Sequence, residues 1–256
     1  MELSNYQQNI LLEHLGYGAG TYAPDKVEIL FIGNESGTAG RSVQDYIERL
    51  TYPEKYKSEA NIDSEKESSP QRRSPMLQYM NRLRLYSIDL NPQWLKPKSE
   101  MESDLYDRVI NESWCAGNTV HLLDIRPLPR PTEDKWPYVN IDQKLYLRAF
   151  NRFDSEGSNP YTDWVRIRKT HLQKKIETFT TIKCIIGAGN PNMKMKFLKE
   201  LFPQVQFDSI IGQSGNKFLV GTHDKGFKII VCKFLNHQNG IGYSGLNDLA
   251  QIAFVQ

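Results

Sequence analysis

The sequence Val-Glu-Ile-Leu-Phe-Ile at residues 27–32 runs directly into Gly-Asn-Glu-Ser-Gly-Thr-Ala-Gly at residues 33–40. The first stretch is a short apolar run rich in β-branched and aromatic residues, which is typical of a strand buried on both faces. The second is a glycine-rich turn, and a helical pattern follows it, with Ser42 as a capping residue and apolar side chains at 43, 46, 47 and 50. This order of strand, turn and helix predicts an α/β fold.

Further short apolar runs rich in β-branched residues occur along the chain. Strands are predicted at residues 119–125, 182–186 and 227–234, with a short extra strand near 218–220 that forms a hairpin with the last. Helical patterns lie at 76–85, 105–114, 145–153, 165–179 and 193–202, and a last helix begins near Ser244. Helices between strands predict a three-layer α/β/α fold with a central, mainly parallel four-stranded sheet.

The 256 residues are expected to form a single domain spanning 1–256. Residues from about 51 to 75 are dense in Glu, Lys, Ser and Pro and poor in aliphatic side chains. This composition indicates a polar insertion in a loop rather than a boundary between domains.

Composition favours a protein that does not enter membranes. No apolar run approaches the roughly 20 residues that a membrane-spanning helix needs. The first residues lack both the basic start and the apolar core of a signal peptide. We therefore expect a cytoplasmic protein, and we expect it to be a monomer.

The three cysteines, Cys115, Cys184 and Cys232, are odd in number and widely spaced. They fit neither a disulfide framework nor a Cys-x-x-Cys metal site, and they are too few for a four-thiolate iron–sulfur cluster. Cys184 and Cys232 lie inside apolar runs, so we interpret both as small buried hydrophobic residues. No metal and no cofactor are expected.

Positive charge is unevenly distributed although the formal net charge is only +2. Residues 144–175 hold eight Lys or Arg against three acidic residues. A solvated helix face and a nucleic-acid contact surface both explain such a run. For nucleic acid, the candidate face is formed by Arg148, Arg166, Arg168 and Lys169.

Three of the predicted strands end in chemically unusual loops, at residues 33–40, 124–131 and 236–243. Because ligands of open parallel sheets bind outside the carboxyl ends of the strands, we expect residues 33–37, Asp124 and the turn of His237 to converge on one pocket. The glycine-rich loop has neither the dinucleotide-binding nor the P-loop spacing, which argues against both of those nucleotide chemistries.

The order and position of these loops resemble the uracil-DNA glycosylase superfamily, over roughly residues 27–253. The loop Gly33-Asn34-Glu35-Ser36-Gly37 matches the family loop whose third residue positions or activates water, so the resemblance gives that role to Glu35. Asp124 stands where many members carry a base-reading Asn. His237 matches the His of the last motif, and Gln238-Asn239 replaces the usual Pro-Ser that follows it.

The chemistry of base excision gives these residue types roles. Cleavage of an N-glycosidic bond builds positive charge on the sugar, which Glu35 can stabilise, and negative charge on the departing base, which His237 can stabilise. An apolar wedge, Ile241 or Tyr243, helps to extrude the base. Phosphate contacts are expected from Arg126 and Arg130, and from Ser36 or Ser244.

The favoured hypothesis is thus a DNA glycosylase-like hydrolase that acts on single-stranded or damaged DNA. The family carries Asp or Asn in several branches where this chain has Glu35, and usually Pro where it has Ser36. These departures, with those at Asp124 and Gln238, leave a second hypothesis open, a catalytically silent member of the fold that binds nucleic acid or a nucleotide. A third is an unrelated Rossmann-like hydrolase of small molecules.

Overall fold

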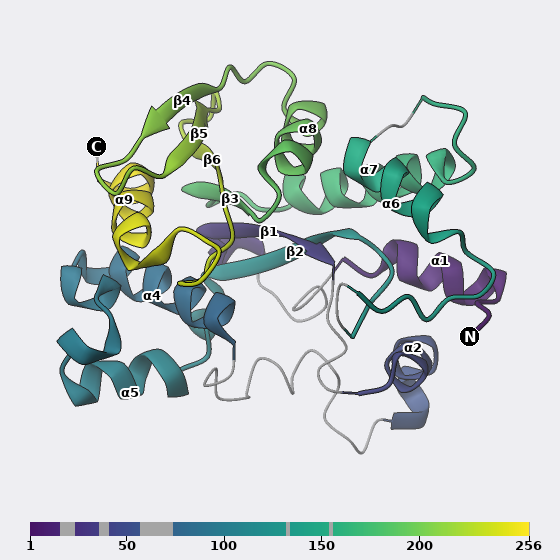
Figure 1. The fold of residues 1–256 in the computed structure, drawn as a ribbon, viewed down its shortest axis with the longest axis horizontal. Helices are drawn as coiled ribbons and strands as arrows, with labels where there is room; N and C mark the ends of the chain where they lie inside the picture. Colours follow the sequence, from purple (N-terminus) through teal and green to yellow (C-terminus); the bar gives the residue numbers. More distant parts are fainter. Residues whose placement is uncertain (16–23, 36–40, 57–73, 132–133, 154–155, 256) are drawn as a thin grey trace. The chain divides into compact units, whose positions relative to one another are not determined.

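The computed structural model describes residues 1–15, 24–35, 41–56, 74–131, 134–153 and 156–255 (Figure 1). These residues form an α/β protein with a six-stranded mixed sheet and eight α-helices. Within the same residues, no helix is long and apolar enough to cross a membrane. Most of the predicted polar insertion, residues 57–73, lies outside the described part of the chain.

The sheet has the strand order β2-β1-β3-β6-β5-β4. Its strands are β1 (Ile29–Glu35), β2 (Val120–Arg126), β3 (Cys184–Ala188), β4 (Asp208–Ile211), β5 (Lys217–Thr222) and β6 (Lys228–Cys232). β3 pairs in parallel with β1 on one side and with β6 on the other. β5 pairs antiparallel with both β6 and β4.

The four strands that the sequence predicted, β1, β2, β3 and β6, are neighbours in this sheet, but the sheet has six strands and not four. The extra hairpin strand expected near residue 218 is β5, and its pairing with β6 is confirmed. β4 was missed because all four of its residues are exposed. An exposed edge strand lacks the apolar pattern by which buried strands are recognised.

Helices occupy the predicted segments. They are α1 (Asn5–Glu13), α2 (Val43–Thr51), α4 (Pro75–Asp89), α5 (Ser103–Asn111), α6 (Gln143–Arg152), α7 (Thr162–Glu177), α8 (Pro191–Leu201) and α9 (Gly242–Phe254). The predicted cap of α2 is present, since the Ser42 hydroxyl accepts a hydrogen bond from the backbone N–H of Asp45 (3.1 Å). α1 was not predicted, although Ser4 and Gln7 form a capping box at its start.

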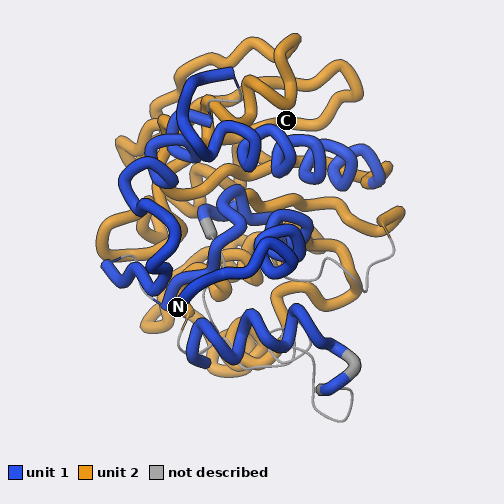
Figure 2. Tube along the Cα trace, turned by 90° about the vertical axis from the view of Figure 1, so that its right-hand side faces the viewer, with its two compact units in different colours: residues 1–22, 33–66, 122–178 blue, residues 23–32, 67–121, 179–256 orange. Residues whose placement is uncertain are grey.

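The chain forms two compact units, each built from separated segments (Figure 2). Unit 1 comprises residues 1–22, 33–66 and 122–178, and unit 2 comprises residues 23–32, 67–121 and 179–256. In unit 1, α1 packs against α2 and α7. In unit 2, α8 packs on β3 and β6, and α4 packs against α5 and α9.

The three cysteines are free and buried. Burial raises the pKa of the Cys184 and Cys232 thiols to about 12, so both stay protonated at neutral pH. The expectation that these two residues are small buried hydrophobic side chains is confirmed.

Arg168 corrects one part of the predicted basic face. It was expected on the surface of α7, but it is 1% exposed. Its guanidinium donates hydrogen bonds to the backbone carbonyls of Leu12, His14, Asp124 and Ile125. Burial lowers the pKa of Arg168 to about 10, while the nearby Asp124 acts in the opposite direction. The side chain therefore ties α7 to the end of α1 and to β2 inside unit 1.

Replacement of this arginine tests its structural role. We expect Arg168→Met to lower the free energy of unfolding by about 3 kcal/mol or more, because four buried carbonyls lose their donor. Arg166→Met, on the exposed side of the same helix, removes only a surface pair with Asp163 and should stay within about 0.5 kcal/mol. Urea denaturation measures both variants, and equal effects would contradict the role of Arg168.

Candidate functional site

Two of the predicted motifs meet inside unit 1. A Cβ atom at Gly33 would collide with the Asp124 carboxylate, so this position requires glycine. Asp124 is 3% exposed, its backbone N–H donates to the carbonyl of Leu15 (3.0 Å) and its carbonyl accepts from Arg168 Nη2 (2.6 Å). The start of the glycine-rich loop and the end of β2 are thus in direct contact.

The rest of the glycine-rich loop is described only in part. Asn34 is half-buried, and its side-chain oxygen is buried without a hydrogen-bond partner in the described structure. Glu35 is the last residue of β1, and its side chain lies outside the described residues, as do Ser36 and Gly37. Their predicted roles stay predictions.

Arg126 and Arg130, the predicted phosphate ligands, are buried in unit 1 at 7% and 5% exposure. Arg126 Nη2 donates to Oδ1 of Asn151 on α6 (2.6 Å). A guanidinium held by a protein acceptor acts first as a packing group. A phosphate would reach either arginine only after local rearrangement.

The turn after β6 presents the predicted histidine in unit 2. His237, Gln238 and Asn239 are all exposed. Asn236 holds the turn, because its side-chain oxygen accepts from the backbone N–H of Asn239 (3.1 Å) and its carbonyl accepts from that of Gly242 (3.0 Å). A Cβ at Gly240 would collide with the carbonyl of Phe234, so the tight path of this turn requires glycine there.

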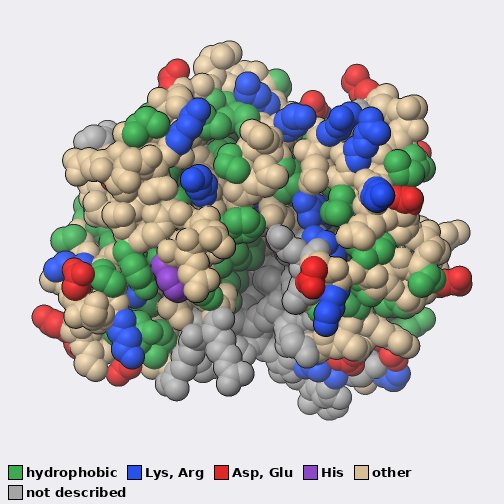
Figure 3. All heavy atoms as spheres, viewed as in Figure 1, with side chains coloured by type: hydrophobic (Ala, Val, Ile, Leu, Met, Phe, Trp, Pro, Cys, Tyr) green, Lys and Arg blue, Asp and Glu red, His purple; other side chains and the backbone are tan. Residues whose placement is uncertain are grey.

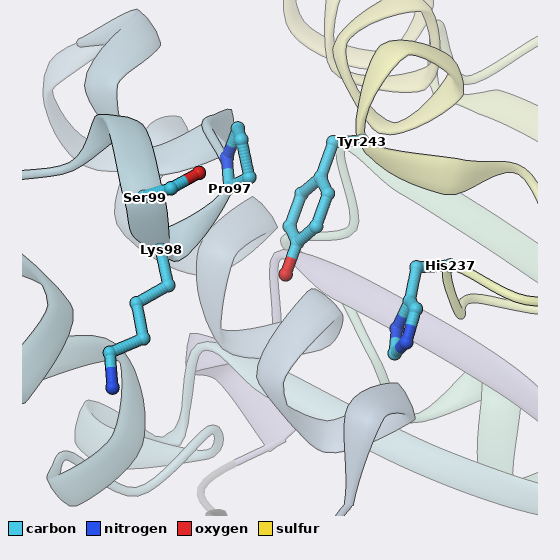
Figure 4. A pocket seen from close by; sticks show the side chains of 5 residues that line it. All are labelled: Pro97, Lys98, Ser99, His237 and Tyr243. Atoms are coloured by element: carbon cyan, nitrogen blue, oxygen red, sulfur yellow. The ribbon is translucent and has the colours of Figure 1, made fainter.

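His237 lines an open pocket of about 560 Å³ together with Tyr243, Pro97, Lys98 and Ser99 (Figure 4). The rings of His237 and Tyr243 project into the same space from the turn and from the first turn of α9. Lys98 lies on the opposite wall with its ammonium pointing away from both rings, and its Nζ lies 5.0 Å from the centre of the Tyr106 ring. This volume is in the range of small-molecule sites. The lining combines an aromatic face, an imidazole and a cation.

Ile241, the other predicted wedge residue, is 2% exposed, and its carbonyl accepts from Asn216 Nδ2 (3.0 Å). It packs into the interior of unit 2. Of the two predicted wedge residues, Tyr243 is therefore the one that lines the pocket.

Behind Tyr243 lie two buried polar residues of α4 that the sequence did not reveal. The rings of Tyr79 and Tyr243 have centroids 5.2 Å apart, and the Arg82 guanidinium carbon lies 5.2 Å from the centre of the Tyr243 ring. Burial raises the pKa of Tyr79 and lowers that of Arg82. The only sequence signal was the spacing of three, which places both side chains on one face of a helix.

Three of the other histidines have structural surroundings. The His121 ring packs edge-on against Phe179 (5.1 Å), and the His223 ring stacks on Phe227 (4.4 Å). His14 Nε2 lies 3.3 Å from the Tyr46 hydroxyl. In the described residues, no group of three His, Cys, Asp or Glu side chains could hold a metal ion.

Comparisons of this chain with protein-family models, with curated proteins and with solved structures found no match.

The contact of Gly33 with Asp124 can be tested by a double-mutant cycle, which measures whether the two substitutions affect the free energy of unfolding independently. We expect Gly33→Ala to lower the free energy of unfolding by roughly 1–3 kcal/mol, because the added methyl group displaces the buried carboxylate. In an Asp124→Ala background the same change should cost at least about 1 kcal/mol less. Chemical denaturation of the four proteins of this cycle gives the coupling energy, and strict additivity would show that the two residues do not press on each other.

Proposed function

We propose that the protein is a DNA glycosylase-like hydrolase that cleaves a base–sugar bond in DNA. The observation that carries this proposal is the shared pocket of His237 and Tyr243 in the turn after β6. An extruded base needs a ring to stack on and a donor for the negative charge that it acquires on leaving. Tyr243 offers the first and the His237 imidazole offers the second.

The arrangement of the strands supports a uracil-DNA glycosylase-like, three-layer α/β/α fold. Strand order reverses at β1, whose two neighbours are β2 and β3. In open α/β sheets, ligands bind outside the carboxyl ends of the strands near such a reversal. Gly33 and Asp124 lie at the ends of β1 and β2 in unit 1, and the turn of His237 follows the carboxyl end of β6 in unit 2.

A DNA substrate also needs a basic surface that contacts phosphates. Lys and Arg side chains gather over α7 (Figure 3). Within unit 1, Arg148 and Arg166 are exposed and Lys169 is half-exposed. With Arg168 buried, these three side chains remain as the candidate face for the backbone of DNA.

A second function, silent binding of nucleic acid or a nucleotide on the same fold, is favoured by one observation. His237 makes no hydrogen bond with the described residues, whereas catalytic imidazoles are usually oriented by a partner. On this alternative the pocket holds a base or nucleotide without cleaving it.

Catalysis distinguishes the two functions. We expect release of a base from oligonucleotides that carry uracil, hypoxanthine, xanthine or an alkylated base, detected by strand cleavage at the abasic site. His237→Ala and Glu35→Gln should each lower turnover by about 100-fold or more. Asp124→Asn should raise uracil excision relative to the other bases, because an amide both donates and accepts hydrogen bonds.

His237 is suited to this test because its side chain is exposed, so its removal should leave the unfolding midpoint unchanged. His171→Ala on α7 is the matched control and should retain full activity. If neither the parent protein nor Asp124→Asn releases any base, the proposal of an active enzyme fails and silent binding becomes the better explanation.

Binding should depend on salt through the basic face of unit 1. We expect Arg148→Glu and Arg166→Glu each to reduce the slope of log affinity against log salt by about one unit, because each removes one phosphate contact. Lys217→Glu on β5 is the control and should leave the slope unchanged. Fluorescence anisotropy with a labelled oligonucleotide measures this slope, and an affinity that is indifferent to salt would contradict DNA binding at this face.

A further inference from the structure

Helix α4 buries two sets of polar side chains in unit 2, and the two sets differ in how well they are paired. Asn81 and Arg84 form the first set. Asn81 Nδ2 donates to the carbonyl of Val109 (3.0 Å), and Arg84 donates to Asn81 Oδ1 (2.9 Å) and to a Glu112 carboxylate oxygen (2.7 Å). This set is satisfied by other protein groups.

Tyr79 and Arg82 form the second set and are also buried, at 1% and 0% exposure. Arg82 Nη1 donates to the carbonyls of Trp94 (2.8 Å) and Lys96 (2.6 Å). Arg82 Nε, Arg82 Nη2 and the Tyr79 hydroxyl have no hydrogen-bond partner in the described structure. Buried donors without an acceptor are costly, so a native protein that keeps three of them together calls for a bound acceptor.

The ring of Tyr243 lies between these donors and the pocket. It contacts Tyr79 and Arg82 and also lines the pocket with Lys98 and His237 (Figure 4). Tyr243 follows directly on Gly242, which has a φ of 64°, at the start of α9. A rotation of this one half-exposed side chain is the shortest way to connect the donors with the pocket.

We propose that Tyr79 and Arg82 form a binding site for a phosphate group, which enters through the pocket when the Tyr243 ring turns aside. The three donors and one guanidinium charge match the oxygens of an anion. None of the described residues that line the pocket is acidic, and Lys98 lies at its wall with its ammonium over the Tyr106 ring. Because burial raises the pKa of Tyr79, its hydroxyl stays protonated and able to donate.

The phosphate has two sources with the same chemistry, the backbone of a nucleic acid or a free phosphate compound. Inorganic phosphate, a 5′-mononucleotide and a short single-stranded oligonucleotide are the probes that distinguish them. Tight binding of the oligonucleotide alone assigns the site to a nucleic-acid backbone, and tight binding of the smaller probes assigns it to a free phosphate compound. Binding is measured without base release, so this proposal stands or falls separately from the proposed function.

The decisive variant is Tyr79→Phe, which removes one unpaired hydroxyl and nothing else. We expect calorimetric titration to show affinity for the binding probe reduced by about tenfold or more, since a hydrogen bond to a charged group is lost. The unfolding midpoint without ligand should stay the same or rise, because the hydroxyl has no protein partner. A tyrosine with only a structural role would not give weaker phosphate binding together with an unchanged or higher unfolding midpoint.

Tyr86→Phe on the same helix is the matched control. Its hydroxyl accepts from Gln251 Nε2 (2.9 Å), so its removal should lower the unfolding midpoint and leave the affinity for phosphate unchanged. Arg82→Lys is a second variant for the site, and it should weaken binding while retaining a cation. The proposal is overturned if no phosphate probe binds, if acetate binds as tightly as phosphate, or if Tyr79→Phe binds like the parent protein.

Discussion

The parallel pairing of β3 with β1 and β6 is the constraint on which the rest of this structure depends. Leu30, Ile185 and Ile229 lie in register across the three strands and are fully buried, and burying a side chain of this size contributes about 1.5–3 kcal/mol. A shift of one residue in any strand would exchange its two faces. The same register fixes where each strand ends, and therefore which loops carry polar side chains.

Buried arginines show how differently one residue type can be accommodated. The Arg168 guanidinium donates hydrogen bonds to four backbone carbonyls, and these bonds account for its burial as a structural group of unit 1. Arg82 is equally buried in unit 2, yet only Nη1 has acceptors. Leaving the other Arg82 donors buried and unpaired is destabilising, and a ligand that accepts their hydrogen bonds would remove this cost. The pocket of Tyr243 and His237 is the place from which such a ligand can reach them.

The sequence predicted the buried strands well because their apolar runs are continuous, as in residues 27–32. It predicted that Gly33 and Asp124 lie in the loops that follow two strands, whereas each lies two residues before the last residue of its strand, β1 or β2. The prediction failed at positions where the outcome depends on whether a side chain is exposed or buried. β4 carries no apolar alternation, and a charged side chain at 168 has the same letter whether it is solvated or buried. Tyr79, Arg82 and Lys98 were missed because the pocket brings together segments that are distant in the chain.

The most direct measurement is a crystal structure of the protein with a short single-stranded oligonucleotide that contains a non-cleavable uridine analogue. We expect one base stacked on Tyr243 with His237 within hydrogen-bond reach, and a phosphate oxygen bonded to Arg82 and Tyr79. An oligonucleotide bound elsewhere, with the pocket of His237 and Tyr243 filled by water alone, would contradict the assignment of this pocket to a nucleic-acid ligand.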